Sequence, residues 1–177
     1  MEQVVLVDEK NNKQGTKEKL QAHKDGDLHR AFSVFIFDSN DKLLLQQRAM
    51  GKYHSAGLWS NTCCSHPREN EGIVKAGQRR LGEELGIDSP DLVKLFSFQY
   101  EVSLENEISE HELDHVLVGR KDEFNIDPDP EEVRDWDWKS ISKIKQEINS
   151  NPDKFTYWFK VIMRDHLDEL KNFLAES

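Results

Sequence analysis

The chain has little cysteine and no excess of basic residues. Its two cysteines are the neighbours Cys63 and Cys64, and adjacent cysteines cannot form an ordinary unstrained disulfide that closes a loop. Lys and Arg number 24 against 34 Asp and Glu, so the formal net charge is −10. These counts exclude a disulfide framework. They also argue against a general nucleic-acid binder, because phosphate backbones are bound by basic surfaces.

Long apolar runs, linkers and repeats are also missing. No apolar run approaches the ~20 residues that a membrane-spanning helix needs, and the N-terminus lacks the basic and apolar segments of a signal peptide. No linker or low-complexity tract divides the 177 residues, a length suited to one domain. We therefore expect a single cytoplasmic domain over residues 1–177, a monomer or homodimer without membrane or nucleic-acid partners.

What is present is a series of strand-like and helix-like segments. Strands are expected at Val4–Asp8, Ala31–Asp38, Lys42–Arg48, Phe96–Val102, Ile108–Gly119 and Val133–Trp138, the second and third forming a hairpin. Helices are expected from Thr16 to about Ala22, from Glu71 to Leu85, over Ser140–Ile148 and over 155–174. The stretch from Ala49 to Glu71 reads as a long irregular loop, and such loops are usually functional. This order predicts an α+β fold with a mixed sheet flanked by helices.

The helix-like stretch from Glu71 to Ile87 carries a motif. Arg80 and Glu84 share a helix face, and alone they would indicate an exposed helix with ion pairs. The full frame is Glu71, seven residues, then Arg-Arg-Leu-Gly-Glu-Glu-Leu-Gly-Ile, and it resembles the Nudix box. Two positions depart from that box, because Ser65 replaces its first glycine and Arg80 the first glutamate of its helical segment. In Nudix hydrolases that glutamate helps to hold magnesium, so the resemblance implies a diphosphate site and argues against hydrolysis.

A second motif precedes this helix: Trp59-Ser60-Asn61-Thr62-Cys63-Cys64-Ser65-His66-Pro67. Cys64 and His66 could form half of a zinc site, but no partner pair stands at finger spacing. The segment resembles the W-x-N-x-x-C-x-H-P pattern of type 1 isopentenyl-diphosphate isomerases, which belong to the Nudix superfamily and have a degenerate box. The resemblance implies that Cys64 is the catalytic cysteine and His66 a metal ligand. We expect Cys63 to be a small buried hydrophobe and Trp59 a wall of the pocket.

A third motif, His111-Glu112-Leu113-Asp114-His115, matches the H-E-x-x-H signature of zinc metalloproteases. That signature works on a helix, where histidines four residues apart share a face, but this segment runs into the strand-like Val116–Gly119. On a strand, side chains alternate, so Glu110 and Glu112 point one way and the two histidines the other. The segment instead resembles the E-x-E of the isomerases. There both glutamates are metal ligands, and the second is also catalytic.

The resemblance covers about Lys19 to Trp158, the expected core, and implies a complete metal site. Alone, His23 and His29 would be taken for surface histidines; in the family they join His66, Glu110 and Glu112. Three imidazoles and two carboxylates favour an octahedral divalent ion, Mn²⁺ or Mg²⁺, although Zn²⁺ could also occupy the site. The remaining histidines match no ligand of the family and are expected at the surface: His54, His111, His115 and His166.

The resemblance also implies a site for a diphosphate. Glu84 matches the carboxylate that holds a second Mg²⁺ on the diphosphate, together with the main-chain carbonyl of Cys64. Mg²⁺ commonly binds through one carboxylate and phosphate oxygens. Four basic residues, each of which alone would be an ordinary solvated side chain, match those that grip the diphosphate: Lys19, Arg48, Lys52 and Arg80.

The implied activity is the interconversion of isopentenyl and dimethylallyl diphosphate in isoprenoid biosynthesis. Moving the double bond requires adding a proton at C4 and removing one from C2, through a tertiary cation kept from water. The family precedent places C4 protonation at Glu112 with Tyr100 and C2 proton transfer at Cys64. It also places a cation-facing ring at Trp158, which alone could equally be a core aromatic. Two alternatives remain: a Nudix diphosphohydrolase of a nucleoside diphosphate derivative, and a non-catalytic metal-binding module.

Overall fold

The computed structural model describes residues 1–88, 91–122 and 125–176. Within these residues, nine strands form one mixed sheet. In chain order the strands are β1 (Gln3–Val7), β2 (Lys13–Glu18), β3 (His29–Phe37), β4 (Lys42–Arg48), β5 (Trp59–Ser60), β6 (Cys63–Ser65), β7 (Val93–Ser103), β8 (Ser109–Arg120) and β9 (Val133–Ser140). The helices are α1 (Lys19–Asp25), α2 (Ile73–Leu85), α3 (Ile141–Ser150), α4 (Tyr157–Asp165) and α5 (Leu167–Glu176), with a 3-10 turn at Pro152–Lys154.

Strand β3 lies at the centre of the sheet. One edge of β3 pairs in parallel with β8 along its whole length, from His29–Glu112 to Phe37–Arg120. The other edge is shared in turn by β1, β6 and β4. Strand β7 extends the sheet beyond β8, and β9 pairs with β4, both antiparallel. The predicted mixed sheet is therefore confirmed.

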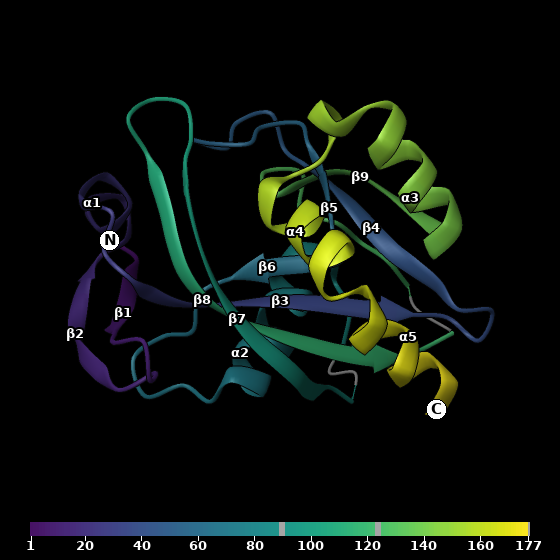
Figure 1. Cartoon of the computed structure of the whole chain (residues 1–177), viewed down its shortest axis with the longest axis horizontal. Coiled ribbons are helices and arrows are strands. Elements are labelled where there is room, and N and C mark those ends of the chain that lie inside the picture. The colour runs from purple at the N-terminus through teal and green to yellow at the C-terminus, as the bar shows by residue number, and fades with distance from the viewer. Residues whose placement is uncertain (89–90, 123–124, 177) are drawn as a thin grey trace.

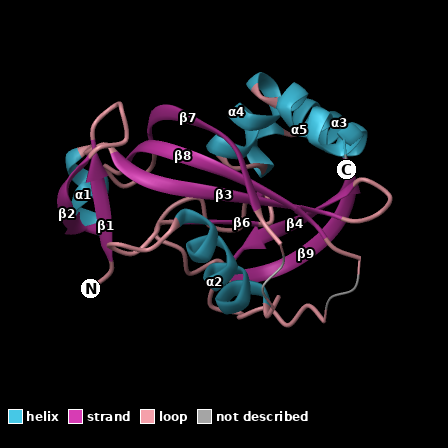
Figure 2. Ribbon diagram, turned by 90° about the horizontal axis from the view of Figure 1, so that it is seen from below, coloured by secondary structure: helices cyan, strands magenta, loops and turns pink. Residues whose placement is uncertain are grey.

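Helices cover both faces of this sheet. Figure 2 shows α2 below it and α3, α4 and α5 above it, while α1, β1 and β2 form one end of the molecule (Figure 1). Alternate residues of β3 divide between two cores. Phe35 and Phe37 pack on the side of α4 and α5, whereas Val34 and Ile36 pack with Leu81 of α2. Burial of apolar surface contributes about 25 cal/mol per Å². Since β3 buries side chains on both of its faces, it stabilises the packing of the helices on both sides of the sheet.

Two glycines of the helical motif explain how α2 ends and how closely it packs. Gly86 has φ 66° and its N–H donates to the carbonyl oxygen of Gly82, a left-handed cap that ends the helix as predicted. A Cβ on Gly77 would lie 2.7 Å from Cδ1 of Leu117. A side chain there would force Leu117 to shift against its neighbours Leu92 and Val34, so glycine permits the observed close contact of α2 with the sheet.

Three expected elements differ in the structure. Thr16 does not cap a helix, because it lies in β2 and pairs with Val5 of β1; α1 is capped instead by the Glu18 carboxylate. The helix expected over 155–174 is divided into α4 and α5 at His166. The expected β3–β4 hairpin pairs only at Phe37–Leu43, since β6 occupies the adjoining part of the β3 edge.

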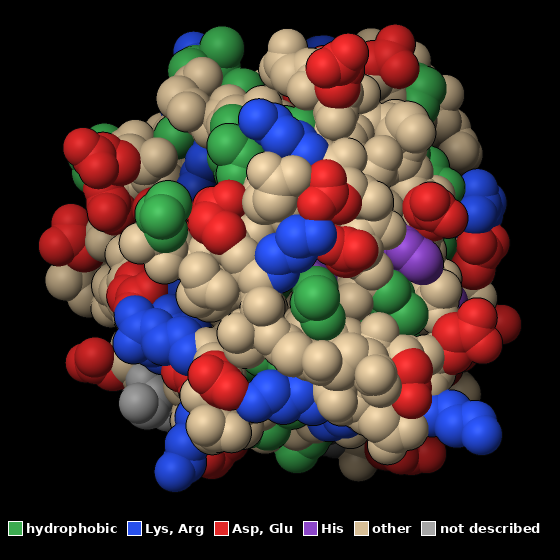
Figure 3. Space-filling view, turned by 90° about the vertical axis from the view of Figure 1, so that its left-hand side faces the viewer, with side chains coloured by type: hydrophobic (Ala, Val, Ile, Leu, Met, Phe, Trp, Pro, Cys, Tyr) green, Lys and Arg blue, Asp and Glu red, His purple; other side chains and the backbone are tan. Residues whose placement is uncertain are grey.

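The surface at the β1–β2–α1 end carries acidic and basic side chains that intermingle (Figure 3). Lys17, for example, lies 2.5 Å from carboxylate oxygens of both Asp25 and Asp27. Such a mixed surface differs from the basic face that a phosphate backbone requires. Among the described residues, no helix has the length and apolar character needed to cross a membrane.

Candidate active site

A cavity of about 580 Å³, partly open to solvent, lies where β3, β6, β8, α2, α4 and the loop after β4 meet. Trp59, expected as a wall, does not line it; Trp59 lies in β5, and its ring is 5.2 Å from Nζ of Lys139. The expected site residues that line the cavity are Lys19, Arg48, Lys52, Cys64, His66, Arg80, Glu84, Tyr100, Glu110, Glu112 and Trp158.

Strand register brings Cys64 and Glu112 to the same cavity. Cys64 pairs with Ser33 of β3, and Glu112 pairs with His29 of the same strand. Because paired residues share a face and β3 residues alternate, both side chains lie on one face of the sheet. Cys63 points the opposite way, fully buried in the core under α2, as expected for a small hydrophobe.

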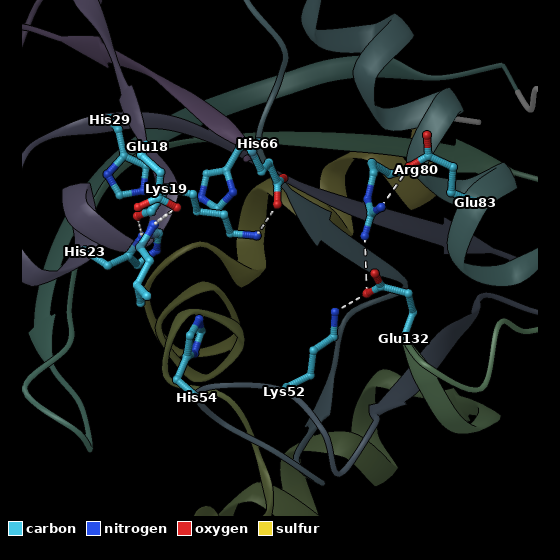
Figure 4. A network of polar contacts seen from close by, with 12 residues as sticks. Glu18, Lys19, His23, His29, Lys52, His54, His66, Arg80, Glu83 and Glu132 are labelled. Carbon is cyan, nitrogen blue, oxygen red and sulfur yellow. Dashed lines mark hydrogen bonds and ion pairs between the residues drawn. The ribbon is translucent and has the colours of Figure 1, made fainter.

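The imidazoles of His23, His29 and His66 lie close together (Figure 4), and all three approach Glu112. Their Nε2 atoms lie 4.0, 3.4 and 3.0 Å from Glu112 Oε1, and all four side chains are buried. One ligand atom from each of the four residues lies within 4.8 Å of the others. The structure therefore assembles four of the five expected ligands into one group that could hold a metal ion.

The hydrogen bonds of two of these rings fix which nitrogen is directed toward Glu112. Nδ1 of His23 lies 2.7 Å from the carbonyl oxygen of Lys19, and Nδ1 of His29 lies 2.8 Å from that of Asp27. A carbonyl only accepts, so each Nδ1 carries the proton and each Nε2 presents a lone pair. Within the described residues neither Nε2 has a hydrogen-bond partner. This orientation by a carbonyl is typical of metal-binding histidines, so the donor set fits a divalent cation.

The fifth expected ligand, Glu110, lies slightly apart and shares a hydroxyl with Glu112. The Tyr100 hydroxyl lies 3.1 Å from Glu110 Oε2 and 2.7 Å from Glu112 Oε2, but its one proton can serve only one of them at a time. Burial and the charge of Glu112 raise the pKa of Glu110 well above its usual range. Burial acts the same way on Glu112, but the neighbouring imidazoles of His29 and His66, 3.4 and 3.0 Å from Oε1, outweigh it and hold that pKa well below the usual range.

The histidines expected at the surface divide into two groups. His54 and His115 are 6% and 3% exposed, so this prediction was wrong for them. His54 lies in a loop that Arg48 draws over the cavity by donating to the carbonyl oxygens of His54 and Ser55. His115 lies on the face of β8 opposite Glu112, and burial lowers its pKa to about 4. His111 and His166 are partly exposed.

The metalloprotease motif does not form its site. Its histidines lie on β8, where they pair with Glu101 and Ser97 of β7, and not on a helix. Their side chains alternate with those of Glu110 and Glu112, as the strand argument predicted. His111 Nδ1 lies 3.0 Å from the carbonyl oxygen of Gly26, away from the group around Glu112.

The other end of the cavity holds cations that are already paired. Glu132 Oε2 contacts Nζ of Lys52 and lies 3.3 Å from Nη2 of Arg80, a chain that Figure 4 shows. Arg80 Nη2 also donates to Glu84 Oε1 at 2.6 Å, and Gln46 donates to Glu84 Oε2 at 2.9 Å. Sequence reasoning missed Glu132 and Gln46, because neither stands in a recognisable motif.

The remaining expected residues are held by contacts of their own. Lys19 Nζ lies 3.0 Å from a Glu2 oxygen. The Arg48 guanidinium lies 5.4 Å above the ring of Trp158, a cation–π contact. Trp158 Nε1 donates to Asn61 Oδ1 at 3.2 Å, which fixes the ring at the cavity wall.

Two buried acidic groups, the Cys64 thiol and the Asp114 carboxyl, lie on the same face of the sheet as Glu112. Burial raises the pKa of the Cys64 thiol to about 12, so the free protein holds it protonated at neutral pH. Burial also raises the pKa of Asp114 to about 8, and Ser33 Oγ donates to Asp114 Oδ2 at 2.7 Å. Asp114 was not predicted, although its position two residues after Glu112 on the same strand face could have suggested it.

Comparison with known sequences gives long matches. The family model described as the NUDIX domain matches residues 27–159. A curated relative from Serratia proteamaculans, named Isopentenyl-diphosphate Delta-isomerase, is 49% identical over 166 residues, which is 93% of this chain and 90% of the relative. A relative of the same name from Photobacterium profundum is 46% identical over 175 residues, 97% of each chain.

Solved structures share the fold at low identity. A protein from Deinococcus radiodurans superposes with a TM-score of 0.74 at 15% identity, covering 92% of this chain and 98% of its own. A MutT protein from Methanosarcina mazei superposes with a TM-score of 0.65 at 17% identity, covering 81% and 96%. These likenesses establish the architecture of a sheet between helices.

Proposed function

Because the chain belongs to the NUDIX domain family, and within it to the isopentenyl-diphosphate Delta-isomerases, we propose that it interconverts isopentenyl and dimethylallyl diphosphate by proton addition and removal. The observation that carries this proposal is the register that places Cys64 and Glu112 in one buried cavity. An allylic shift needs an acid and a base on the two sides of a C2–C4 unit. The cavity supplies the Cys64 thiol from β6, the Glu112 carboxylate from β8 and the Tyr100 hydroxyl from the neighbouring strand β7.

The side chains that can carry a proton in this cavity suit a reversible reaction. Toward dimethylallyl diphosphate, the Glu112–Tyr100 pair donates a proton to C4 and Cys64, as thiolate, takes one from C2. The opposite direction starts with the proton on Cys64 and the carboxylate of Glu112 free. The raised pKa of Cys64 and the lowered pKa of Glu112 favour that second distribution in the free protein. The two directions therefore start from opposite placements of one proton, on the Glu112–Tyr100 pair or on Cys64. The tertiary cation is the intermediate in both directions.

The walls of the cavity suit a short-lived cation. Trp158 is 3% exposed and presents its ring to the cavity, and such a ring attracts a desolvated cation by about 2 kcal/mol. Burial of Tyr100 and Trp158 excludes water that would otherwise capture the cation as an alcohol. We assign these two residues to proton transfer and cation stabilisation respectively.

We infer that the imidazole–carboxylate group holds one divalent ion. His23, His29, His66, Glu110 and Glu112 would bind it, and Mn²⁺ or Mg²⁺ suits this N/O set, with Zn²⁺ a further candidate. When bound, the ion supplies positive charge that keeps the carboxylates ionised and fixes their orientation. The Nε2 lone pairs of His23 and His29, which are directed toward Glu112 and have no hydrogen-bond partner within the described residues, support this assignment.

The opposite end is proposed to bind the diphosphate. Lys19, Lys52 and Arg80 offer their cations there, and Arg48 contributes from above Trp158. Glu84, with the main-chain carbonyl of Cys64, would hold a Mg²⁺ carried by the diphosphate. A carboxylate has about four lone-pair sites, so the hydrogen bonds of Glu84 to Arg80 and Gln46 leave room for a metal.

We propose that residues 1–177 act as one cytoplasmic catalytic unit, as a monomer or homodimer. Supporting this, the cavity draws its walls from residues as far apart in sequence as Lys19 and Trp158. Light scattering after size-exclusion chromatography measures the state of assembly.

A product assay tests the proposed function. The protein is incubated with isopentenyl diphosphate and Mg²⁺, and the products are identified by NMR. Dimethylallyl diphosphate is the expected product. Isopentenyl monophosphate with free phosphate would instead support the hydrolase alternative, and tight metal binding without turnover of any diphosphate would support the non-catalytic module.

A further inference from the structure

His54 is a buried imidazole beside the metal group that the expected ligand set does not include. Its Nε2 lies 3.4 Å from Glu110 Oε1, and its ring stacks on that of His23 at 6.0 Å between centroids, 29° between planes. On another side it meets Trp158 edge-on at 6.2 Å. Figure 4 shows the His54 ring directed from its loop toward the other histidines.

The loop that carries His54 is fixed by contacts from β4 and from the β7–β8 connection. Arg48 of β4 donates to the carbonyl oxygens of His54 and Ser55, each at 3.2 Å. Glu105, from the β7–β8 connection, accepts from the N–H of Ser55 at 2.7 Å. Ser55 has φ 49°, a left-handed conformation that non-glycine residues rarely adopt and that persists where the surroundings impose it. The position of the His54 imidazole is therefore determined by contacts between the loop and the rest of the fold.

Nε2 of His54 and Oε1 of Glu110, 3.4 Å apart, have a separation that two ligands of one ion can have. With bonds of about 2.1 Å, neighbouring ligand atoms of an octahedral ion lie about 3.0 Å apart and opposite ones about 4.2 Å apart. His54, Glu110 and His23 each offer an atom within 4.8 Å of the other two. His23 also belongs to the group with His29, His66 and Glu112. The two groups therefore meet at one fully buried ring, whose Nε2 has no other partner within the described residues.

We propose that Nε2 of His54 is a sixth ligand of the divalent ion, so that the site contains four imidazoles and two carboxylates. The inference rests on the metal site of the proposed function and enlarges it. Nδ1 of His54 lies 3.2 Å from Ser55 Oγ, and a proton donated there leaves the Nε2 lone pair free. Ser55 thus does for His54 what the main-chain carbonyls of Lys19 and Asp27 do for His23 and His29.

A site with six protein ligands is closed. No coordination position remains for the water that an open catalytic site turns into hydroxide. The ion then serves to orient and ionise Glu110 and Glu112, and it does not generate a nucleophile for attack on the diphosphate. His54 would in this way contribute to keeping the chemistry at the carbon skeleton.

The experiment compares the protein with His54→Gln and the matched control His111→Gln, each loaded with Mn²⁺ alone. Pulsed EPR counts the imidazole nitrogens on the ion, and competition with a chelator gives the dissociation constant. We expect four imidazoles in the parent protein and in the control, and three in His54→Gln. Because loss of a partner that merely orients a ligand already costs about 10–100-fold in metal affinity, His54→Gln should lose about 100-fold, and the control less than about 2-fold.

The outcomes separate this inference from the proposed function. A count of three imidazoles in the parent protein overturns it, and this count depends on no variant. Unchanged affinity in a folded His54→Gln also overturns it, because the variant keeps a polar side chain beside Glu110 and removes only the imidazole lone pair. Turnover of isopentenyl diphosphate is measured on the same samples. Four imidazoles without turnover would support His54 as a ligand and contradict the proposed function. Three imidazoles with turnover would contradict His54 as a ligand and support the proposed function.

Discussion

The two ends of the cavity differ in how their charges are satisfied. Around Glu112, the Nε2 atoms of His23 and His29 are buried without hydrogen-bond partners in the described residues. At the opposite end, Lys52 and Arg80 are already joined through Glu132. Figure 4 shows both arrangements in one view. The first end presents imidazole lone pairs that suit a cation, and the second end holds a carboxylate where the substrate's anion would bind.

This difference predicts how one end should respond to a metal ion and the other to a diphosphate. Buried nitrogen lone pairs cost free energy until something binds them, so a metal ion adds a partner without displacing one. A diphosphate must instead take Lys52 and Arg80 from Glu132, exchanging one anion for another. Burial would raise the pKa of Glu132, but hydrogen bonds and charge from Lys52 and Arg80 outweigh it and lower that pKa, so the carboxylate competes as an anion.

The largest expected effect comes from the residue between the two ends. Cys64→Ala removes the group that exchanges a proton with C2, and turnover should fall by about 10³-fold or more, since a positioned acid or base contributes 10²–10⁴. Binding of pyrophosphate with Mg²⁺, measured by calorimetry, should stay within about 2-fold, because the thiol does not act on phosphate.

Cys63→Ala is the matched control for that variant. Its side chain is buried on the other face of the sheet, so it should cost about 1 kcal/mol of stability and little turnover. If Cys63 proved essential and Cys64 dispensable, the strand register that defines the cavity would be wrong.

The next effect concerns the end of the site around Glu112. His66→Ala should weaken Mn²⁺ binding by about 100-fold, because a ligand is lost together with its hydrogen bond to Glu112. His115→Ala should leave binding nearly unchanged, since that ring lies on the opposite face of β8. Chelator competition measures both variants. Loss of metal from variants of both His111 and His115 would contradict the strand placement and revive the protease motif.

A smaller effect is expected at the end whose cations are paired. Glu132→Gln removes the competing charge, so pyrophosphate should bind about 5-fold more tightly, the equivalent of about 1 kcal/mol for a partly exposed ion pair. Arg80→Gln should weaken the same binding, because a fork of two donors is lost. Weaker binding in Glu132→Gln would show that Glu132 positions the cations and does not compete with the anion.

The motifs in the sequence predicted the part of the site that regular structure determines. The period of two along β8 predicted which face Glu110 and Glu112 occupy, and the left-handed cap at Gly86 followed from the glycine after Leu85. Both are local properties of the chain. The ligand roles of His23 and His29 came only from the resemblance, since neither residue is distinctive alone.

The parts that could not be predicted depend on contacts between distant residues. Thr16 joined a strand because β1 offered a partner, although its sequence also suited a helix start. His54 is buried because Arg48 and Glu105 fix its loop, and no periodicity reveals this in an irregular segment. Glu132 meets Arg80 only after β9 and α2 have packed on either side of the cavity.

Isomerisation in deuterated water tests the central claim, that this cavity moves protons on carbon and leaves the diphosphate intact. The protein is incubated with isopentenyl diphosphate and Mg²⁺ in D₂O, and carbon-bound deuterium and free phosphate are measured together. Dimethylallyl diphosphate should gain deuterium at the methyl group derived from C4, with no phosphate or pyrophosphate released. Rapid release of phosphate without deuterium in the recovered carbon skeleton would contradict the account.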